Sequence, residues 1–255
     1  MNLLLLREVL DVLLRLLESE LYSCVLLCSE IREAGSVKTI CSPNFDARET
    51  GVPIDMLVIH YTGMQTCDSA IARMCSPVSR VSAHFCIQED GNILQLVMEE
   101  NRAWHAGVAF WRGFTNINSR SIGIEVVNPG HDFGYAAFPN EQILSLENLC
   151  LDLLARHDIP AQNIVGHSDI APRRKRDPGE LFPWERMASL GIGLWPDKIS
   201  STVSEPAINL GCYGYEIESL KSTIEAFQRH YRQNCVNGVW DFDCAARLAA
   251  LRNLA

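Results

Sequence analysis

The chain has 255 residues, 47% of them apolar, which is enough to bury a sizeable core. Its formal net charge of −9 argues against nucleic acid or an anionic membrane surface as the main partner and leaves an uncharged or cationic substrate open. Ten cysteines without a CxxC pair argue against a thiolate zinc site and a dense disulfide framework, so we expect mostly buried small residues, with one or two disulfides open.

The N-terminal stretch combines many leucines with charged residues. Residues 1–30 read "MNLLLLREVLDVLLRLLESELYSCVLLCSE", and the charges between Arg7 and Glu18 recur at helical spacing. The apolar part of a secretory signal is free of charge, so we favour an amphipathic helix, with export or membrane anchoring through this helix as the alternative. No charge-free run approaches the ~20 residues that span a bilayer, so no transmembrane segment is predicted.

Strand and helix patterns alternate from about residue 55 onward. Short apolar runs at 56–62, 121–128 and 162–170 predict buried strands, and 102–107 has a strand-like pattern. Residues 81–97 predict two strands joined by a tight turn at Asp90 and Gly91, while 68–75 and 140–158 have helical spacing. The alternation predicts an α/β (α+β) fold with a central mixed β-sheet flanked by helices.

Composition divides the chain into four parts. Residues 1–41 hold the N-terminal amphipathic helix and a polar entry loop, and 42–197 form the predicted α/β domain. The Ser- and Pro-bearing segment 198–209 reads as a linker. Residues 210–255 contain two amphipathic patterns, at 216–232 and 241–254, and predict a small all-α C-terminal module.

Three residues at or after the ends of predicted strands have side chains of the types that bind zinc in proteins. His60 ends one predicted strand, His167 ends another, and Asp177 lies on the following Pro-rich loop "APRRKRDPG". A catalytic zinc site needs three protein ligands and an open position for water. Two neutral histidines and one carboxylate leave the ion a net charge of roughly +1, which acidifies bound water toward a pKa of ~7. Each histidine alone is also compatible with a hydrogen-bonded structural role.

A hydrolytic site also needs a proton acceptor and a group that stabilises developing negative charge. Glu125 in "SIGIEVVN" is flanked by apolar residues, so burial would raise its pKa toward the working pH, as a general base requires. Lys175 could stabilise charge on a substrate oxygen, and Trp104 and His105 could line a groove. The alternatives are that Glu125 faces solvent and that Lys175 belongs to a solvated basic loop.

In this order, the motifs "VIHYTG", "VSAHF", "WHAG", "SIGIEVVNPG" and "GHSDIAPRRKRDPG" resemble a known family. They are similar to the zinc-dependent N-acetylmuramoyl-L-alanine amidases of the AmpD/AmiD type, which share their fold with phage lysozyme-type amidases and the peptidoglycan recognition proteins. The resemblance covers roughly residues 42–197. It implies one Zn²⁺ per chain, held by His60, His167 and Asp177.

The same resemblance assigns the remaining site residues. It implies that Glu125 and Lys175 are catalytic. It also implies that the substrate groove is formed near Trp104, His105, Asn128 and His84, where His84 is a supporting residue rather than a metal ligand.

The implied reaction is hydrolysis of the amide between N-acetylmuramic acid, or its anhydro form, and L-alanine of a peptidoglycan stem peptide. The C-terminal residues are similar to a peptidoglycan-binding module, which favours the periplasm or cell envelope, whereas the charged N-terminus favours the cytoplasm. Peptidoglycan or a muropeptide is the expected partner; intact glycan, anhydro-muropeptide and lipid-linked precursor all remain open. The alternative is a non-catalytic recognition protein of the same fold, although this chain keeps all five metal-binding and catalytic residues.

Overall fold

The computed structural model describes residues 37–196 and 202–254. The predicted helix within residues 1–36 and the start of the predicted linker lie outside the described residues. In chain order the elements are β1 (Lys38–Thr39), β2 (Phe45–Ala47), β3 (Met56–Tyr61), α2 (Cys67–Cys75), β4 (Phe85–Ile87), β5 (Ile93–Gln95), β6 (Asn101–Ala103), α3 (Ile117–Arg120), β7 (Ser121–Val126), α4 (Gly130–Phe133), α5 (Asn140–Arg156), η1 (Ala161–Asn163), β8 (Ile164–Gly166), α6 (His167–Ile170), α7 (Trp184–Ser189), α8 (Pro206–Tyr213), α9 (Leu220–Tyr231) and α10 (Phe242–Arg252).

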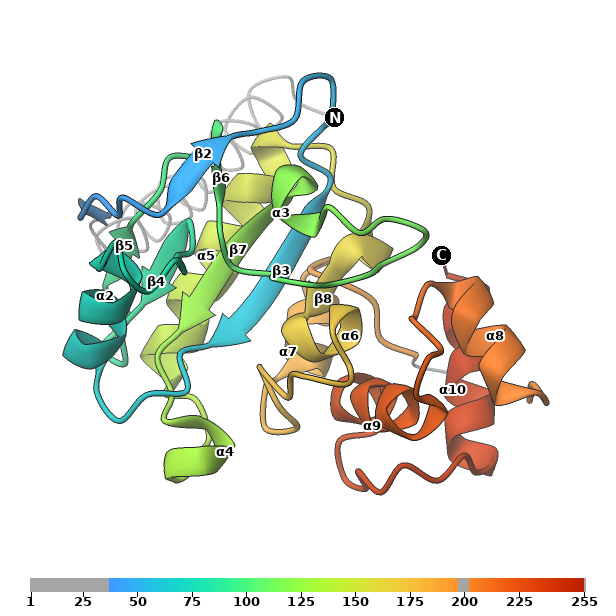
Figure 1. The fold of residues 1–255 in the computed structure, drawn as a ribbon. Helices are drawn as coiled ribbons and strands as arrows, with labels where there is room; N and C mark the ends of the chain where they lie inside the picture. Colours follow the sequence, from blue (N-terminus) through green and yellow to red (C-terminus); the bar gives the residue numbers. More distant parts are fainter. Residues whose placement is uncertain (1–36, 197–201, 255) are drawn as a thin grey trace, which may run out of the picture. The chain divides into compact units, whose positions relative to one another are not determined.

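Six strands form one sheet in the order β1-β5-β4-β7-β3-β8 (Figure 1). Every neighbouring pair is parallel except β4 and β5, which form the predicted antiparallel hairpin. The turn between them needs a glycine, because Gly91 has φ +84°, a conformation that other residues rarely adopt. Strands β2 and β6 pair separately. The predicted central mixed sheet flanked by helices is confirmed.

Strand β3, which lies between β7 and β8, shows how the sheet is covered on both faces. Successive side chains of a strand point to opposite faces. Leu57 and Ile59 therefore pack in the hydrophobic cluster that includes α5, while Met56 and Val58 belong to the cluster on the other face. His60 follows Met56 and Val58 in this alternation, at the carboxyl end of the strand. The strand thus carries its polar residue to the edge of a buried face.

The C-terminal helices pack against the same face of the sheet. Tyr213 of α8, Phe227 of α9 and Leu248 of α10 belong to one cluster with Met56 and Val58. Figure 1 shows these helices, coloured orange to red, packed together, with α9 beside α6. The helices predicted within 216–232 and 241–254 are confirmed, and α8 begins at Pro206, inside the predicted linker. The division into a catalytic domain and a peptidoglycan-binding module stays a prediction.

Two segments near the predicted site differ from expectation. Strand β6 ends at Ala103, so "WHAG" forms a loop, because the N–H of Trp104 donates to a serine side chain rather than to a strand. His167 begins the short helix α6, although residues 162–170 were predicted to be a strand, and the observed strand β8 ends at Gly166. Helix α6 forms there because Asp169 Oδ2 accepts from the N–H of Gly166 and satisfies the start of the helix.

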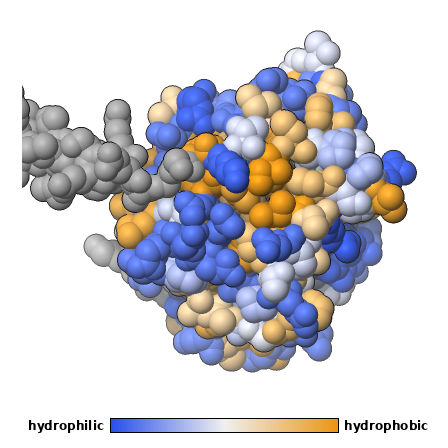
Figure 2. All heavy atoms as spheres, turned by 90° about the vertical axis from the view of Figure 1, so that its left-hand side faces the viewer, coloured by the Kyte–Doolittle hydropathy of each residue, from blue (hydrophilic) through white to orange (hydrophobic). Residues whose placement is uncertain are grey.

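The surface gives few further constraints. Figure 2 shows the face on the side of α2 and β5, where apolar side chains gather within a mainly hydrophilic surface. Across the described ranges, no helix is long and apolar enough to cross a membrane. The eight cysteines in those ranges are free, and only Cys86, Cys150 and Cys244 are buried, so the expectation that most cysteines are buried small residues is wrong for the described part of the chain.

Candidate metal centre and active site

The parallel strands bring the predicted site residues to one edge of the sheet. His60 and Glu125 are paired across β3 and β7, and His167 directly follows Gly166, which ends β8. Because parallel strands end at the same edge, residues far apart in sequence meet there. The expected convergence of His60, His167 and Glu125 is therefore a property of the sheet register.

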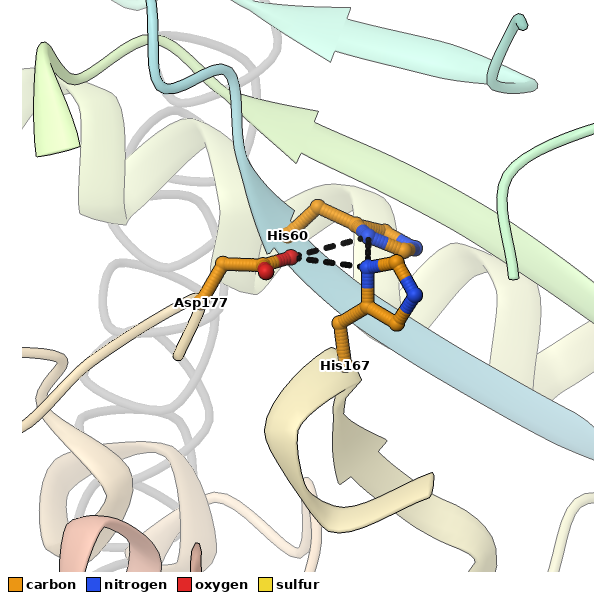
Figure 3. Close-up of side chains that lie close together, drawn as sticks. All are labelled: His60, His167 and Asp177. Atoms are coloured by element: carbon orange, nitrogen blue, oxygen red, sulfur yellow. Dashed lines mark hydrogen bonds and ion pairs between the residues drawn. The ribbon is translucent and has the colours of Figure 1, made fainter. Parts of the chain in front are cut away.

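The donor atoms of His60, His167 and Asp177 form a closed triangle (Figure 3). His60 Nδ1 lies 2.8 Å from His167 Nδ1 and 3.1 Å from Asp177 Oδ2, and His167 Nδ1 lies 3.0 Å from the same oxygen. Donors that bind a tetrahedral zinc at 2.0–2.1 Å lie about 3.3 Å from one another. These three buried residues could therefore hold a metal ion.

The hydrogen-bond partner of His167 supports this fit. Its Nε2 lies 3.0 Å from the carbonyl oxygen of Ala106, which can only accept, so Nε2 carries the proton. The lone pair of His167 Nδ1 then points at His60 Nδ1 and at the Asp177 carboxylate. An arrangement of facing lone pairs is stabilised by a cation between them.

The protonation states are those that metal ligands require. Burial, and next the charge of His167, lowers the pKa of His60 to about 4. Burial raises the pKa of Asp177, but the two histidines, whose Nδ1 atoms lie 3.0 and 3.1 Å from its Oδ2, outweigh this effect and hold that pKa far below its usual range. His60 is therefore neutral and Asp177 ionised at neutral pH.

Glu125 lies near this triangle. Together with His167 and Asp177 it lines a cavity of about 330 Å³. Its Oε2 is buried and has no hydrogen-bond partner among the described residues. Burial, and next the charge of Asp177, raises the pKa of Glu125 well above its usual value, while Lys175 opposes the shift. A carboxylate of this kind is a strong proton acceptor.

Lys175 lines the same cavity. Among the hydrogen bonds and ion pairs of residues 37–196 and 202–254, none involves its amino group, whereas each neighbouring arginine is paired. The arginine pairs are Arg173 with Glu216, Arg174 with the carbonyl of Ala106, and Arg176 with Asp132. The backbone of the loop is fixed as well, since the N–H of Ser168 donates to the carbonyl of Asp177 at 2.8 Å.

The four residues expected in the substrate groove have different positions. Trp104 and His105 line the cavity, but His105 directs both ring nitrogens into the protein. His84 is fully buried, with Nδ1 accepting from a backbone N–H, so it supports the sheet and does not reach the cavity. Asn128 is buried too, and its amide bonds two neighbouring backbone groups. Neither residue lines the cavity, so the position of His84 agrees with the supporting role expected for it, and the groove role of Asn128 stays a prediction.

Two residues of the site were not anticipated from sequence. Asp169, two residues after His167, accepts from Tyr215 and His230 of the C-terminal segment. Ser121, at the start of "SIGIEVVN", contacts the ring of His105. Asp169 stood within the motif already singled out, but its partners lie 46 and 61 residues away and have no local signal.

A three-donor site beside an unpartnered carboxylate, in a polar cavity, is the arrangement of hydrolases that use a metal ion to activate water. The chain belongs to the N-acetylmuramoyl-L-alanine amidase family, because the Amidase_2 family model, described by that name, matches residues 50–180. The predicted family, fold and enzyme class are thereby confirmed.

Similar proteins cover different parts of the chain. It is 37% identical over 229 residues to the N-acetylmuramoyl-L-alanine amidase AmiD of Escherichia coli (strain K12), covering 78% of this chain and 82% of AmiD. The structure of AmiD with the substrate anhydro-N-acetylmuramic acid-L-Ala-D-gamma-Glu-L-Lys matches with TM-score 0.72, 36% identity, and coverage of 81% of this chain and 91% of that chain.

A second structure and a shorter relative complete the comparison. AmpDh3 from Pseudomonas aeruginosa, in complex with anhydromuramic pentapeptide, matches with TM-score 0.73 and 33% identity, covering 81% of this chain and 94% of that chain. The 1,6-anhydro-N-acetylmuramyl-L-alanine amidase AmpD of Haemophilus influenzae is 35% identical over 170 residues, which cover 60% of this chain and 90% of AmpD. The AmpD relative is therefore shorter than this chain.

Proposed function

We propose that this amidase uses one zinc ion, held by His60, His167 and Asp177, to hydrolyse the amide between N-acetylmuramic acid and L-alanine of peptidoglycan stem peptides. One observation carries the proposal: the triangle of donors closes at 2.8–3.1 Å, and two of its residues line the same cavity as Glu125, whose Oε2 has no hydrogen-bond partner among the described residues. The neutral or carboxylate donors suit zinc, and the open cavity leaves room for water and substrate.

The side chains divide the chemical work. When bound, zinc supplies a Lewis acid that polarises the amide carbonyl and acidifies water. Glu125 takes the proton from the attacking water and returns it to the leaving amine of L-alanine, which its raised pKa makes favourable. Lys175 donates a hydrogen bond to the oxygen on which negative charge develops.

The substrate we favour is a muropeptide with the anhydro sugar. The AmiD and AmpDh3 complexes hold anhydromuramic peptides. The match to this chain covers more than nine tenths of each of those two chains. Intact peptidoglycan and the lipid-linked precursor are the competing substrates. A non-catalytic recognition role has less support, because the base and the lysine are retained with the metal donors.

Product analysis tests the function. Zinc-loaded protein is incubated separately with anhydro-muropeptide, intact peptidoglycan and lipid-linked precursor, and the products are identified by mass spectrometry. We expect free stem peptides that begin with L-alanine, with the anhydro-muropeptide cleaved fastest, and none after chelation. Release of glycan fragments or of peptides cut within the stem would contradict the proposal.

We further propose that the protein acts in the periplasm or cell envelope. The support is the C-terminal helical segment. The match to the AmpD relative covers 90% of that protein but only 60% of this chain, so this chain has residues for which that relative has no counterpart. A second docking surface raises the affinity for a polymer such as the cell wall, so it would retain the enzyme in the envelope whichever muramyl peptide it cleaves. Fractionation of cells that express the full chain, with detection in each compartment, tests the location.

A further inference from the structure

His105 and Ala106 lie on one loop, and both histidines of the metal centre direct their outer ring nitrogens, Nε2, toward it. His167 Nε2 lies 3.0 Å from the carbonyl of Ala106, and His60 Nε2 lies 3.0 Å from His105 Nδ1. The carbonyl fixes the tautomer of His167, because it can only accept. The partner of His60 is an imidazole, which can donate or accept, so the tautomer of His60 depends on what fixes His105.

Ser121 fixes the tautomer of His105. The hydroxyl of Ser121 donates its one proton to the carbonyl of Ile117 at 2.7 Å, so Oγ can only accept from His105 Nε2, which lies 3.1 Å away. Nδ1 of a neutral His105 is then an acceptor, and His60 must donate to it from Nε2. The lone pair of His60 Nδ1 is thereby left for the metal.

The opposite tautomer of His105 does not support the site. If Nδ1 of His105 carried a proton, His60 Nε2 would have to accept it, and His60 Nδ1 would carry the remaining proton. That proton would point at the Nδ1 of His167, 2.8 Å away, in the place where the metal binds. The direction of every bond from Ile117 to His60 is therefore set by one backbone carbonyl.

The ring of His105 has little freedom to move. It is 8% exposed and lies against Gly123, where an added Cβ would be 2.4 Å from His105 Cγ. The backbone is held too, since the N–H groups of His105 and Ala106 both donate to Asn118 Oδ1, at 3.2 and 2.8 Å. A ring fixed in this way can orient a neighbouring ligand.

We propose that His105 is a positioning residue of the metal centre, not a substrate-binding residue, and that with Ser121 it fixes the tautomer and orientation of His60. The inference rests on the proposed function, because it presupposes the metal ion. Outer partners of metal-binding histidines typically contribute 10–100-fold to metal affinity. His105 should therefore affect zinc affinity before it affects substrate binding.

Zinc affinity of full-length variants, measured by competition with a chromophoric chelator, tests the role of His105. In His105→Leu the apolar side chain fills the space but accepts no hydrogen bond, so we expect the zinc Kd to rise about 10–100-fold. In His105→Asn the amide oxygen lies near the place of Nδ1 and can accept, so we expect a Kd within about threefold of wild type. Ser121→Ala should give an intermediate loss.

A matched control separates affinity from general stability. Leu149→Ala removes a buried side chain of α5 on the other face of the sheet, so it should lower the Tm without changing the zinc Kd. Long-range ¹H–¹⁵N correlation spectra of the zinc-loaded wild type should show the Nε2–H tautomer for both His60 and His105. Ser121→Ala should disturb that pattern at His105.

The outcomes distinguish the inference from the proposed function. If wild type binds zinc and His105→Leu binds it equally well, or His105→Asn loses as much as His105→Leu, the positioning role is wrong while the function stands. An Nδ1–H tautomer at His105 in the zinc-loaded protein also overturns it. If wild type binds no stoichiometric zinc, the proposed function fails and takes this inference with it.

Discussion

His230 Nδ1 donates to Asp169 Oδ2 at 2.7 Å, and this bond joins α9 to the short helix that begins with the metal-site residue His167. Asp169 also accepts from the hydroxyl of Tyr215 at 2.7 Å and from the N–H of Gly166 at 2.8 Å. Two of the three donors to this buried carboxylate thus belong to the C-terminal segment. That segment stabilises the helix that carries a metal ligand.

Removal of the His230 donor should destabilise the protein. In His230→Leu the fully buried carboxylate of Asp169 loses a hydrogen bond, and hydrogen bonds to charged groups contribute about 1.5–3 kcal/mol. We expect a loss of this size in the free energy of urea unfolding and weaker zinc binding. Lys221→Gln, near the start of α9, removes a 4.0 Å pair between an exposed lysine and Glu225 and should change unfolding by less than about 1 kcal/mol. Equal effects of the two substitutions would contradict the role of the bond.

Glu125→Gln should abolish cleavage and leave zinc binding intact. Glutamine keeps the shape of the side chain but cannot take a proton from water, and general acid–base catalysis contributes roughly 10²–10⁴-fold. The measurements are kcat on muropeptide and zinc content by elemental analysis. Glu141→Gln, on the exposed start of α5, is the control and should be fully active. Unchanged turnover in Glu125→Gln would show that another group is the base.

Lys175→Met should lower kcat by about 10²–10³-fold with a smaller effect on KM, because the amino group acts on charge that develops in the transition state. The neighbouring pair of Arg176 and Asp132 lies on the surface. Exposed pairs contribute little, so Arg176→Gln should change kcat less than twofold. Steady-state kinetics of both variants decides whether the basic loop has one catalytic cation or a diffuse charge effect.

Zinc should stabilise the wild type and fail to stabilise Asp177→Asn. An ion that binds only the folded state adds about 2.7 kcal/mol of stability when its concentration is 100 times the Kd. Asp177→Asn removes the one negative donor of the triangle, so its Tm should not respond to the same zinc concentration. Calorimetry with and without zinc makes the comparison. A wild-type Tm that is independent of zinc would contradict the metal assignment.

His84 should contribute to the loss of stability in acid. Burial, and next the charge of Arg48, lowers its pKa from 6.5 to about 3, so the folded state holds it neutral. Below pH 6.5 the unfolded chain takes up a proton that the folded state does not, so this contribution to stability is complete above pH 6.5 and falls toward pH 3.

The variant His84→Gln, which cannot titrate, isolates that effect. It should be less stable than wild type at pH 7, because the bond from Gly123 to His84 Nδ1 is lost. The gap in unfolding free energy should narrow as the pH falls to 4.5, by an amount on the order of 2 kcal/mol. Urea unfolding of the metal-free proteins at several pH values measures the gap. A gap that stays constant with pH would rule out the neutral buried His84.

The sequence predicted the parts of the site that depend on strand register. His60, Glu125 and His167 stand at the ends of apolar runs, and parallel strands bring such ends together. The mixed sheet and the helix at 140–158 followed from apolar periodicity for the same reason. Apolar residues that recur every two positions in strands and about every 3.6 positions in helices encode these features directly.

The sequence could not predict contacts that depend on how loops and helices close on the sheet. His84 and His105 have similar local surroundings, yet one ring supports the sheet and the other meets a metal-site histidine. The bond between Asp169 and His230 joins residues 61 positions apart, and no periodic pattern links them. The helix α8 was missed because its residues after Pro206 were read as a polar connection.

Gly123 lies directly against the ring of His105, so the residue that position 123 can hold depends on the side chain at position 105. Any side chain at position 123 would overlap the His105 ring, since even a Cβ would lie 2.4 Å from it. Alanine at position 105 would make room, because the overlap is with the ring atoms of His105, but it would leave His60 Nε2 without its acceptor. Each single step toward a larger residue at position 123 therefore passes through a protein with either a distorted sheet or an impaired site. Gly123 has no reactive side chain, yet it constrains evolution of this site: position 105 has to change before position 123 can hold a larger residue.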